Sequence, residues 1–291
     1  MQWGPRLVLR VTELNQLVVS SLNGKRAQVM NIDKWTSGRD YDQWMGRWSR
    51  LVADEFLTWL GLSSNLRWLD VCCGSGVLTE AIVERCAPAR VAGIDASAEQ
   101  IRFARAHRAG PGVNFEIGDA LNLPFAADSF DGAVCGLGLN FVPEPERAVR
   151  EMRRVTAPKG ILGGYVWDYA EGVRFLREFW DAAAGADSEA WTYDQGRRFP
   201  LCRPEALQEL FERGGMKEVE VVGLSITTRF TSFDDYWQPL LTGQGSAPNY
   251  LETRNELTRQ AIRERLRRTL PTDAEGAIAL PARAWAVRGQ R

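Results

Sequence analysis

Short apolar runs alternate with amphipathic segments through the middle of the chain, and this alternation predicts an α/β fold in which helices connect parallel strands. The apolar runs are only a few residues long, whereas the segments between them repeat their apolar residues at helical spacing. The expected strands are one that ends on Asp70 and four over 91–94, 113–119, 132–136 and 161–167, with helices over 77–86, 98–108 and 146–156.

The most informative segment is WLDVCCGSG, residues 68–76, which reads as a strand, an acidic residue and a turn of small residues before a helix. Small residues let the backbone approach a nucleotide-like ligand closely. The second strand ends on Asp95, 19 residues after Gly76. An acid at that place in a nucleotide-binding α/β fold can accept hydrogen bonds from ribose hydroxyls. The spacing therefore predicts a nucleotide site, and the alternative is a tight turn that merely precedes a helix.

Two classes of nucleotide ligand are compatible with this spacing. A dinucleotide fingerprint has a third glycine where this chain has Thr79. Asp70 at the mouth of the turn would oppose a pyrophosphate, whereas it would attract the ammonium group of an amino acid. The turn therefore favours a nucleotide that carries an amino-acid group.

The segment resembles motif I of the class I S-adenosylmethionine-dependent methyltransferases, which usually reads Asp/Glu-x-Gly-x-Gly-x-Gly. The departure is Cys72, which stands at the first glycine position and is expected to narrow the space beside the methionine part of the cofactor. Further on, "GDALNLPF" and "DSFDGAV" are similar to the methyltransferases of quinone biosynthesis. The resemblance covers roughly residues 40 to 170 well and the remainder more loosely.

The resemblance implies a Rossmann-like, seven-stranded, mostly parallel sheet with helices on both faces and helical, aromatic lid insertions. It also implies S-adenosyl-L-methionine as the cofactor, with Asp119 near the adenine and the backbone N–H that follows it on a ring nitrogen. The residues expected to bind the cofactor are Tyr41, Asp70, Cys72, Gly74, Ser75, Gly76, Asp95, Ala96, Asp119, Ala120, Leu121 and Gly136.

Composition agrees with a soluble, cytoplasmic enzyme. The net charge is −1, so no overall field attracts nucleic acid or an anionic membrane. The five cysteines lack the spacing of a metal site or of a disulfide framework, which favours a reducing compartment. No apolar run is long enough to span a membrane. Neither a metal ion nor a membrane is expected as a partner, and the sequence assigns no oligomeric state.

The first segment is expected to lie outside the enzyme domain. Family-like sequence begins just after Met30, so residues 1–29 are interpreted as an extension that adds little to function, and residues 30–291 as one methyltransferase domain. The apolar residues near the start are interrupted by Arg10 and Glu13, which argues against a signal peptide. Deleting residues 1–29 is expected to leave the melting temperature and the cofactor affinity unchanged.

Tyr41, Trp44 and Trp48 follow at helix-compatible spacing. They either cover the cofactor, as N-terminal helices do in related methyltransferases, or simply pack their helix onto the sheet. Arg47 could reach the cofactor carboxylate, although a solvated charge is the simpler interpretation.

The second half is expected to select the acceptor. Two insertions, about 168–201 and 231–275, carry many aromatic residues and lie outside the common core. Insertions at the carboxyl ends of strands border the ligand crevice, so part of the aromatic set should hold an apolar or planar acceptor while the rest forms core. The remaining expected elements are strands over 219–230 and 277–287 and helices over 204–213 and 251–270.

The sequence offers few candidates for a general base. The only histidine, His107, is expected at the surface, away from the acceptor. Asp168 and Tyr169, just past the fifth strand, and Asn140, past the fourth, are the best polar candidates for a catalytic role. Methyl transfer by proximity alone, to an amine, a phenolate or an acidic carbon, is equally compatible with the chain.

Several functions therefore stay open, led by a methyltransferase acting on a small molecule. An RNA or protein methyltransferase is the second interpretation, since the helix over 251–270 carries many arginines. Two observations argue against this second interpretation. Glutamates on the same helix allow intrahelical pairs with the arginines. The Asn/Asp-Pro-Pro-aromatic motif of nucleic-acid amino-methyltransferases is also absent after the fourth strand. A nonenzymatic module that binds the cofactor is the third interpretation, and an NAD-dependent oxidoreductase is a distant fourth.

Overall fold

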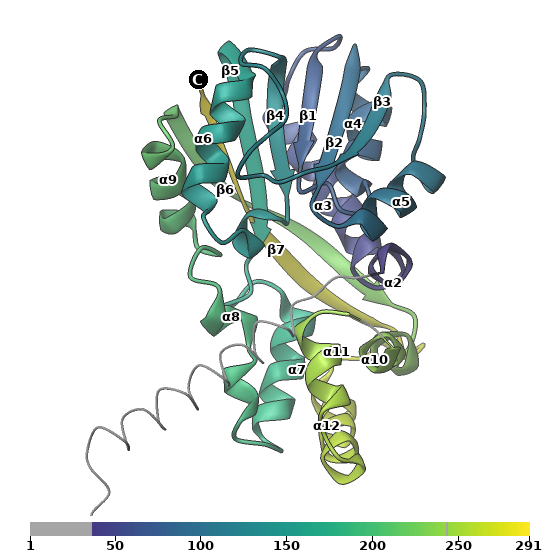
Figure 1. Cartoon of the computed structure of the whole chain (residues 1–291). Coiled ribbons are helices and arrows are strands. Elements are labelled where there is room, and N and C mark those ends of the chain that lie inside the picture. The colour runs from purple at the N-terminus through teal and green to yellow at the C-terminus, as the bar shows by residue number, and fades with distance from the viewer. Residues whose placement is uncertain (1–36, 243) are drawn as a thin grey trace, which may run out of the picture.

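The chain forms a twisted sheet with helices on both faces and a separate group of helices beyond one end of the sheet (Figure 1). The computed structural model describes residues 37–242 and 244–291. The proposed extension over 1–29 lies outside the described residues and stays a prediction. Among the described helices, none has both the length and the apolar character that crossing a bilayer requires.

The sheet contains seven strands in the order β3-β2-β1-β4-β5-β7-β6. The strands from β3 to β5 in this order are parallel to one another, and β7 runs antiparallel to both of its neighbours, β5 and β6. The sheet is therefore mostly parallel. The expected fold class is confirmed. The strands are β1 (Arg67–Val71), β2 (Arg90–Asp95), β3 (Val113–Ile117), β4 (Phe130–Gly136), β5 (Thr156–Trp167), β6 (Lys217–Phe230) and β7 (Ile278–Gln290).

The central strands are apolar along most of their length because helices cover both faces. One face is covered by α3 (Arg47–Leu60), α4 (Val77–Cys86) and α5 (Ala98–His107), and the other by α6 (Pro145–Val155) and α9 (Pro204–Arg213) (Figure 1). Local signals set the helix ends. Ser97 caps α5 by accepting a hydrogen bond from the N–H of Gln100, and Gly61 ends α3 in the left-handed conformation.

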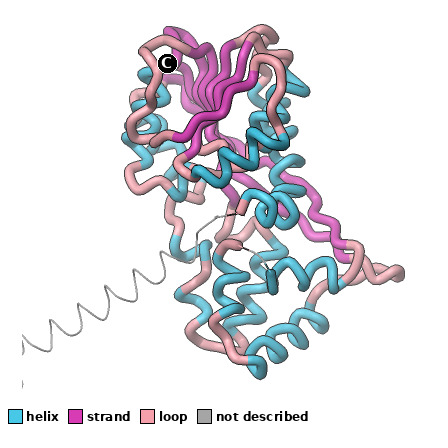
Figure 2. The backbone as a smooth tube through the Cα atoms, turned by 45° about the vertical axis from the view of Figure 1, so that its right-hand side comes forward, coloured by secondary structure: helices cyan, strands magenta, loops and turns pink. Residues whose placement is uncertain are grey.

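Strands β6 and β7 continue past the end of β5 and reach the helices below the sheet (Figure 2). These helices, which we call the helical layer, come from the two segments expected to be insertions. Its members are α7 (Arg174–Ala184), α8 (Gln195–Arg198), α10 (Phe233–Thr242), α11 (Ser246–Glu252) and α12 (Glu256–Thr269).

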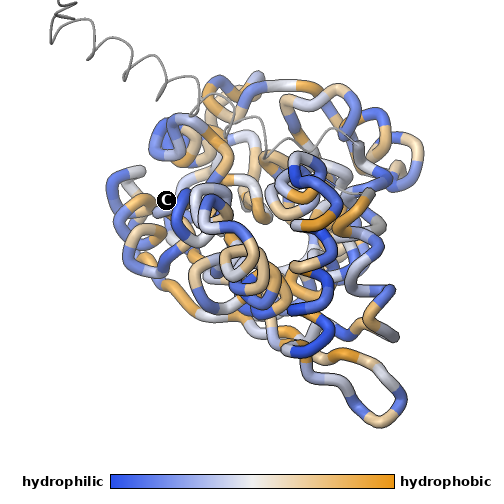
Figure 3. Tube along the Cα trace, turned by 90° about the horizontal axis from the view of Figure 1, so that it is seen from below, coloured by the Kyte–Doolittle hydropathy of each residue, from blue (hydrophilic) through white to orange (hydrophobic). Residues whose placement is uncertain are grey.

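Most aromatic side chains of the two insertions form the core of the helical layer. Trp180 and Tyr250 are almost fully buried and lie 5.5 Å apart between ring centroids, and Phe179 packs edge-on against Trp180. Viewed from below, hydrophilic and hydrophobic residues alternate along the helices, as expected where one side of each helix is buried (Figure 3). Most aromatic residues of the two insertions therefore stabilise the helical layer and do not line a ligand pocket.

Several element boundaries differ from the expectation, and three of these differences have a local cause. The helix expected over 251–270 is two helices, because Asn255 caps α12 by accepting a hydrogen bond from the N–H of Thr258. Strand β5 begins at Thr156 and passes through Lys159, which has a φ of +67° where the pairing with β4 shifts register. Strand β3 ends at Ile117, before Asp119, whose backbone forms an isolated bridge with Asn122.

The described part of the chain begins with a short segment, residues 37–46, which we call the lid. It is distinct from the two insertions that form the helical layer. It consists of α2 (Gly38–Tyr41) and a π-helical turn over Asp42–Gly46, and it continues directly into α3. Single π-helical turns are uncommon and often occur at functional sites. Gly38 packs against the ring of Phe103 on α5, so the lid rests on the body of the domain.

Candidate active site

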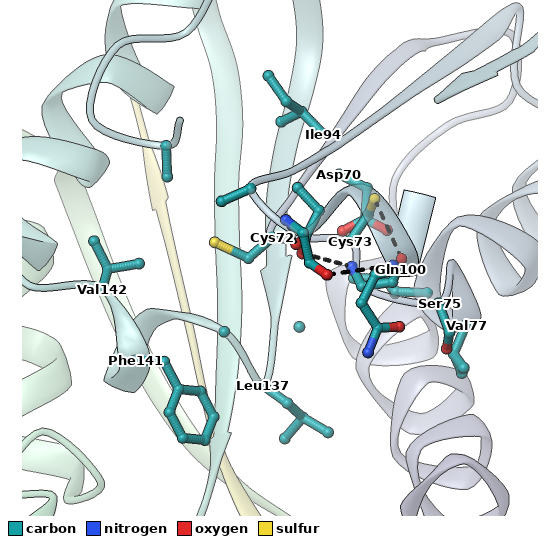
Figure 4. Close-up of a pocket in the computed structure, with 18 of the residues that line it drawn as sticks. Asp70, Cys72, Cys73, Ser75, Val77, Ile94, Gln100, Leu137, Phe141 and Val142 are labelled. Carbon is teal, nitrogen blue, oxygen red and sulfur yellow. Dashed lines mark hydrogen bonds between the residues drawn. The ribbon is translucent and has the colours of Figure 1, made fainter. Parts of the chain in front are cut away.

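A cavity of about 320 Å³ lies at the carboxyl ends of the central strands. Ligands of open α/β sheets bind at this edge. In Figure 4, the acidic and small residues of the turn after β1 lie on one side, and Leu137, Phe141 and Val142, which follow β4, lie on the other. The lid contributes Tyr41 and Met45 to the lining.

The turn after β1 has a left-handed backbone at two glycines and leaves room for a ligand. Gly74 and Gly76 have φ values of +53° and +85°. A Cβ atom added at Gly74 would meet no atom within 4 Å, so the space beside this residue is empty cavity. The Asp95 carboxylate holds the turn, because it accepts hydrogen bonds from the N–H groups of Gly74 at 2.9 Å and Ser97 at 2.8 Å.

Asp70 is a buried acid with unused bonding capacity. One carboxylate oxygen accepts a hydrogen bond of 2.7 Å from the Thr79 hydroxyl, and the other, Oδ1, has no hydrogen-bond partner among the described residues. Burial, and then repulsion by the Asp95 carboxylate, raise the pKa of Asp70 to about 7. A cation placed beside Oδ1 would compensate the buried charge.

Cys72 is accommodated by a glycine elsewhere in the chain. It has a φ of +57°, and its Cβ lies where a side chain on Gly138 would stand, 2.5 Å from the position of a Cβ added there. Cys72 therefore occupies space that Gly138, in the loop after β4, leaves empty. Burial raises the pKa of the neighbouring Cys73 thiol well above its usual range, and a hydrogen bond with Cys72 and then burial do the same for the pKa of Cys135. Both thiols therefore stay protonated at neutral pH.

Most residues expected to bind the cofactor line this one cavity. Asp119 is among them, and its carboxylate accepts a hydrogen bond of 2.9 Å from the Leu121 N–H, which shapes the loop after β3. Gly76 and Leu121 do not line the cavity. The expected residues that do are Tyr41, Asp70, Cys72, Gly74, Ser75, Asp95, Ala96, Asp119, Ala120 and Gly136.

An aromatic wall, formed by Phe141, Tyr165, Trp167 and Tyr169, lines the cavity at the ends of β4 and β5. Tyr165 and Trp167 were not singled out from the sequence, although they are two residues apart on a strand and therefore point to the same side. Burial raises the pKa of Tyr165 well above its usual range, so its hydroxyl is neutral.

The three candidate catalytic residues lie in different surroundings. Tyr169 lines the cavity, whereas Asp168 and Asn140 do not. The Asp168 carboxylate forms an ion pair with Arg283 on β7, with nitrogen–oxygen distances of 2.6 and 2.9 Å, and only 4% of its side chain is exposed. Asp168 therefore holds β5 to β7 rather than facing the cavity.

The aromatic residues at the start of the chain divide between covering and packing. Tyr41 lines the cavity and shares a hydrogen bond of 2.8 Å with Ser49. Trp44 and Trp48 are buried and pack against Phe175 or Phe230. Arg47 does not line the cavity, and it forms an ion pair of 3.0 Å with Asp235 on α10.

The histidine lies where the sequence placed it. His107 is exposed at the end of α5, where its ring stacks on Phe103 and is absent from the cavity lining. The next residue, Arg108, was not singled out from the sequence, yet its side chain is buried and bonds to the turn after β1.

Comparison with known proteins identifies the family. The family model described as a methyltransferase domain matches residues 69–163. A demethylmenaquinone methyltransferase of Desulfitobacterium hafniense is 30% identical over 180 residues, which cover 55% of this chain and 70% of the relative. That of Staphylococcus aureus is 30% identical over 174 residues, which cover 56% and 72%. This chain belongs to the class I S-adenosylmethionine-dependent methyltransferases. It is therefore an enzyme, and its cofactor is S-adenosylmethionine.

Solved structures agree on the fold of this methyltransferase. The YcgJ protein of Bacillus subtilis is 18% identical with a TM-score of 0.52, and the match covers 83% of this chain and 98% of that one. Phosphoethanolamine N-methyltransferase 2 of Haemonchus contortus, solved with S-adenosylmethionine, is 14% identical with a TM-score of 0.52, and the match covers 82% and 52%. At these identities the likeness shows the fold alone.

The cavity of this methyltransferase fits its cofactor on two observations. The unpartnered, buried Oδ1 of Asp70 suits an ammonium group, and the empty space beside Gly74 lets a ligand approach the backbone of the turn. Both features belong to one cavity lining.

Proposed function

We propose that this methyltransferase binds S-adenosylmethionine in the cavity and methylates a small, largely apolar acceptor that sits against the aromatic wall. The observation that carries the proposal is the composition of the lining. Aromatic rings line the cavity together with the acidic turn, and no lysine, arginine or histidine is among the described lining residues. Such a site suits a flat, largely apolar molecule.

The cofactor end of the proposed site is formed by acids and backbone groups. Asp70 holds the ammonium group through Oδ1, and the turn at Gly74 and Ser75 approaches the methionine part. Asp95 accepts hydrogen bonds from the ribose, because each carboxylate oxygen can accept more than the one backbone N–H that it already binds. Asp119 and the N–H of the following residue serve the adenine.

At the acceptor end, we infer that the residues of the cavity orient the acceptor and that none of them acts as a general base. The bound cofactor provides an electrophilic methyl group on its sulfonium sulfur. The aromatic wall excludes water and holds the acceptor in line with that group. Tyr165 has a raised pKa, so its hydroxyl can donate a hydrogen bond to the acceptor but does not act as a phenolate base. The acceptor then brings its own nucleophile, as an amine, a phenolate or an acidic carbon does.

The relatives suggest the first acceptor class to test. They are named for methyl transfer to demethylmenaquinone, and a reduced quinone ring is flat, apolar and easily ionised. An RNA acceptor would require cations along its phosphates. Two of the arginines on α12 instead lie within 3.5 and 3.7 Å of Asp234 on α10. We therefore place the acceptor among small molecules.

Calorimetric titration with S-adenosylmethionine and S-adenosylhomocysteine is the first test. Micromolar binding of both supports the proposed cofactor site, and the second step offers methyl-labelled cofactor with a reduced quinone, with total RNA or with protein. Label in the quinone or in another small acceptor supports the proposal. Label in RNA or protein alone contradicts it, and binding without transfer to any acceptor favours a regulatory module.

A matched pair of aromatic variants tests the wall. Phe141 lines the cavity, and Phe199, whose ring centroid lies 5.2 Å from that of Phe141, does not. Phe141→Ala is expected to lower kcat/KM for the acceptor about ten-fold, and Phe199→Ala to change it less. Equal losses in both variants would show that the rings only support packing.

A further inference from the structure

A closed ring of four ion pairs joins the lid to the body of the domain. Arg108 contacts Asp42 at 2.5 Å and Glu80 at 3.0 Å, and Arg50 contacts the same two acids at 2.8 and 3.8 Å. Acids and arginines alternate around the ring, so its formal charges cancel. Asp42 belongs to the lid, whereas the other three residues belong to α3, α4 and the end of α5.

Arg108 is the buried member of this ring, with 3% of its side chain exposed. A buried guanidinium is tolerated only when its donors are satisfied, and a planar fork of donors suits several acceptors at once. Arg108 contacts Asp42 through Nη2 and Glu80 through Nε, and its Nη1 donates a hydrogen bond of 2.6 Å to the backbone carbonyl of Ser75.

The contact with Ser75 connects the ring to the cavity. Ser75 lies in the turn after β1, between the two glycines with positive φ, and it lines the cavity. A Cβ added at Gly76 would stand 3.1 Å from Cδ of Arg108, so this glycine lets the arginine stem pass close to the turn. One side chain therefore bonds both to the turn proposed to bind the cofactor and to the lid.

The lid lies against the same cavity. Tyr41 and Met45 line it on either side of Asp42 in the sequence, and the π-helical turn that contains Asp42 brings Asp42 onto Arg108. Movement of this segment away from the domain would separate Asp42 from Arg108 and withdraw two residues from the cavity lining.

We propose that Arg108 is a positioning residue that locks the lid to the turn after β1, so that release of the cofactor requires the Arg108–Asp42 pair to break. This inference rests on the proposed binding of S-adenosylmethionine in the cavity. It assigns a role in cofactor exchange to a residue that touches neither the cavity nor the aromatic wall. A purely structural arginine would instead support the melting temperature without setting the rate of exchange.

The test measures how fast S-adenosylhomocysteine dissociates in stopped-flow displacement by excess S-adenosylmethionine. Asp42→Ala and Arg108→Met are each expected to raise the dissociation rate about ten-fold, because losing one partner of a buried charge pair acts mainly on dissociation. Arg108→Lys keeps the charge but loses the planar guanidinium that binds three acceptors at once. Its dissociation rate is expected to lie between those of these two variants and that of the wild type. Asp42→Ala carries the test if Arg108→Met fails to fold.

Asp54→Ala is the matched control. Asp54 pairs with Arg85 at 3.2 Å across α3 and α4, which are also joined by the ring, but it contacts neither the lid nor the turn. Its dissociation rate is expected to stay within two-fold of the wild type. Hydrogen exchange of the lid amides should increase in Asp42→Ala and not in Asp54→Ala.

The outcomes separate the inference from the proposed function. Faster dissociation in Asp42→Ala and Arg108→Met, with the double variant no faster than Arg108→Met alone, supports the lock. Wild-type dissociation rates in the lid and Arg108 variants overturn it, whatever their melting temperatures. A wild-type protein that binds neither S-adenosylmethionine nor S-adenosylhomocysteine contradicts the proposed function, and the lock with it.

Discussion

The carboxylate of Asp95 accepts a hydrogen bond of 2.9 Å from the backbone N–H of Gly74. The pair joins the end of β2 to the turn after β1, 21 residues earlier in the sequence. The acid that we propose for the ribose therefore also holds the glycine turn in its left-handed conformation. Substitutions at either residue should act on the same ligand, although for different physical reasons.

Asp95→Ala is expected to weaken S-adenosylmethionine binding by about 1–3 kcal/mol, because the ribose hydroxyls and the Gly74 N–H lose their acceptor. Calorimetric titration measures this change. The wild type should bind a cofactor analogue without ribose hydroxyls more weakly than S-adenosylmethionine. In Asp95→Ala, the difference in affinity between these two ligands should be smaller. Unchanged affinity in the variant would remove Asp95 from the ribose role.

Gly74→Val is expected to abolish cofactor binding while the chain stays folded, because the side chain would enter the empty cavity rather than the protein. Gly276→Val is the control. Gly276 also has a positive φ, +83°, and no atom within 4 Å of an added Cβ, but it lies outside the cavity lining. Both variants carry a backbone strain of about 1–2 kcal/mol. Normal binding by Gly74→Val would show that the ligand lies elsewhere.

Cofactor affinity is expected to rise with pH through the raised pKa of Asp70, about 7 in the free protein. Below this pH the carboxyl is protonated, so binding an ammonium group must first release a proton. The dissociation constant at pH 6 should be about ten-fold higher than at pH 8, and Asp70→Asn should remove most of this dependence. Equal wild-type affinity at both pH values would contradict the ammonium contact.

The same shift predicts a change in the stability of the ligand-free protein. Between about pH 4 and pH 7 the folded state keeps a proton on Asp70 that the unfolded state has lost. Protonation of Asp70 therefore contributes fully to the free energy of unfolding below the pKa that this carboxyl has in the unfolded chain. The contribution is lost as the pH rises through 7. Urea unfolding of wild type and Asp70→Asn should show the wild type losing stability relative to the variant across this window.

Asp168→Asn is expected to lower stability by about 2 kcal/mol and to leave cofactor affinity within two-fold of the wild type, because the substitution weakens the charged hydrogen bonds of the buried Asp168 with the partly exposed Arg283, away from the cavity. Chemical denaturation and calorimetry measure the two quantities. Loss of turnover without loss of stability would instead return Asp168 to a catalytic role.

The sequence predicted the nucleotide half of the fold because its signals are local. The strand before Asp70, the small-residue turn and the spacing to Asp95 all lie within 28 residues, and the structure joins them directly. The placement of Cys72 shows the limit of local motifs. Gly138 accommodates its side chain, and that glycine lies 66 residues further along the chain.

Arg108 and the acceptor wall could not be predicted for related reasons. An arginine after His107 at the end of a helix has the pattern of a solvated cation, whereas its three polar partners lie 28 to 66 positions away in the sequence. The aromatic residues of the insertions pack against each other, as Trp180 and Tyr250 do, and hydrophobicity alone does not distinguish such a core from a ligand pocket.

The long pairing of β6 with β7 limits how the active site can open. Their ladder runs from Lys217 opposite Gln290 to Phe230 opposite Ile278, whereas β5 leaves β7 at Ala284. After a register shift between Lys217 and Glu220, the ladder is regular as far as Phe230, so a two-stranded ribbon attaches the helical layer to the sheet. We therefore expect both substrates to exchange by local displacement of short segments at the rim rather than by a hinge between two rigid halves.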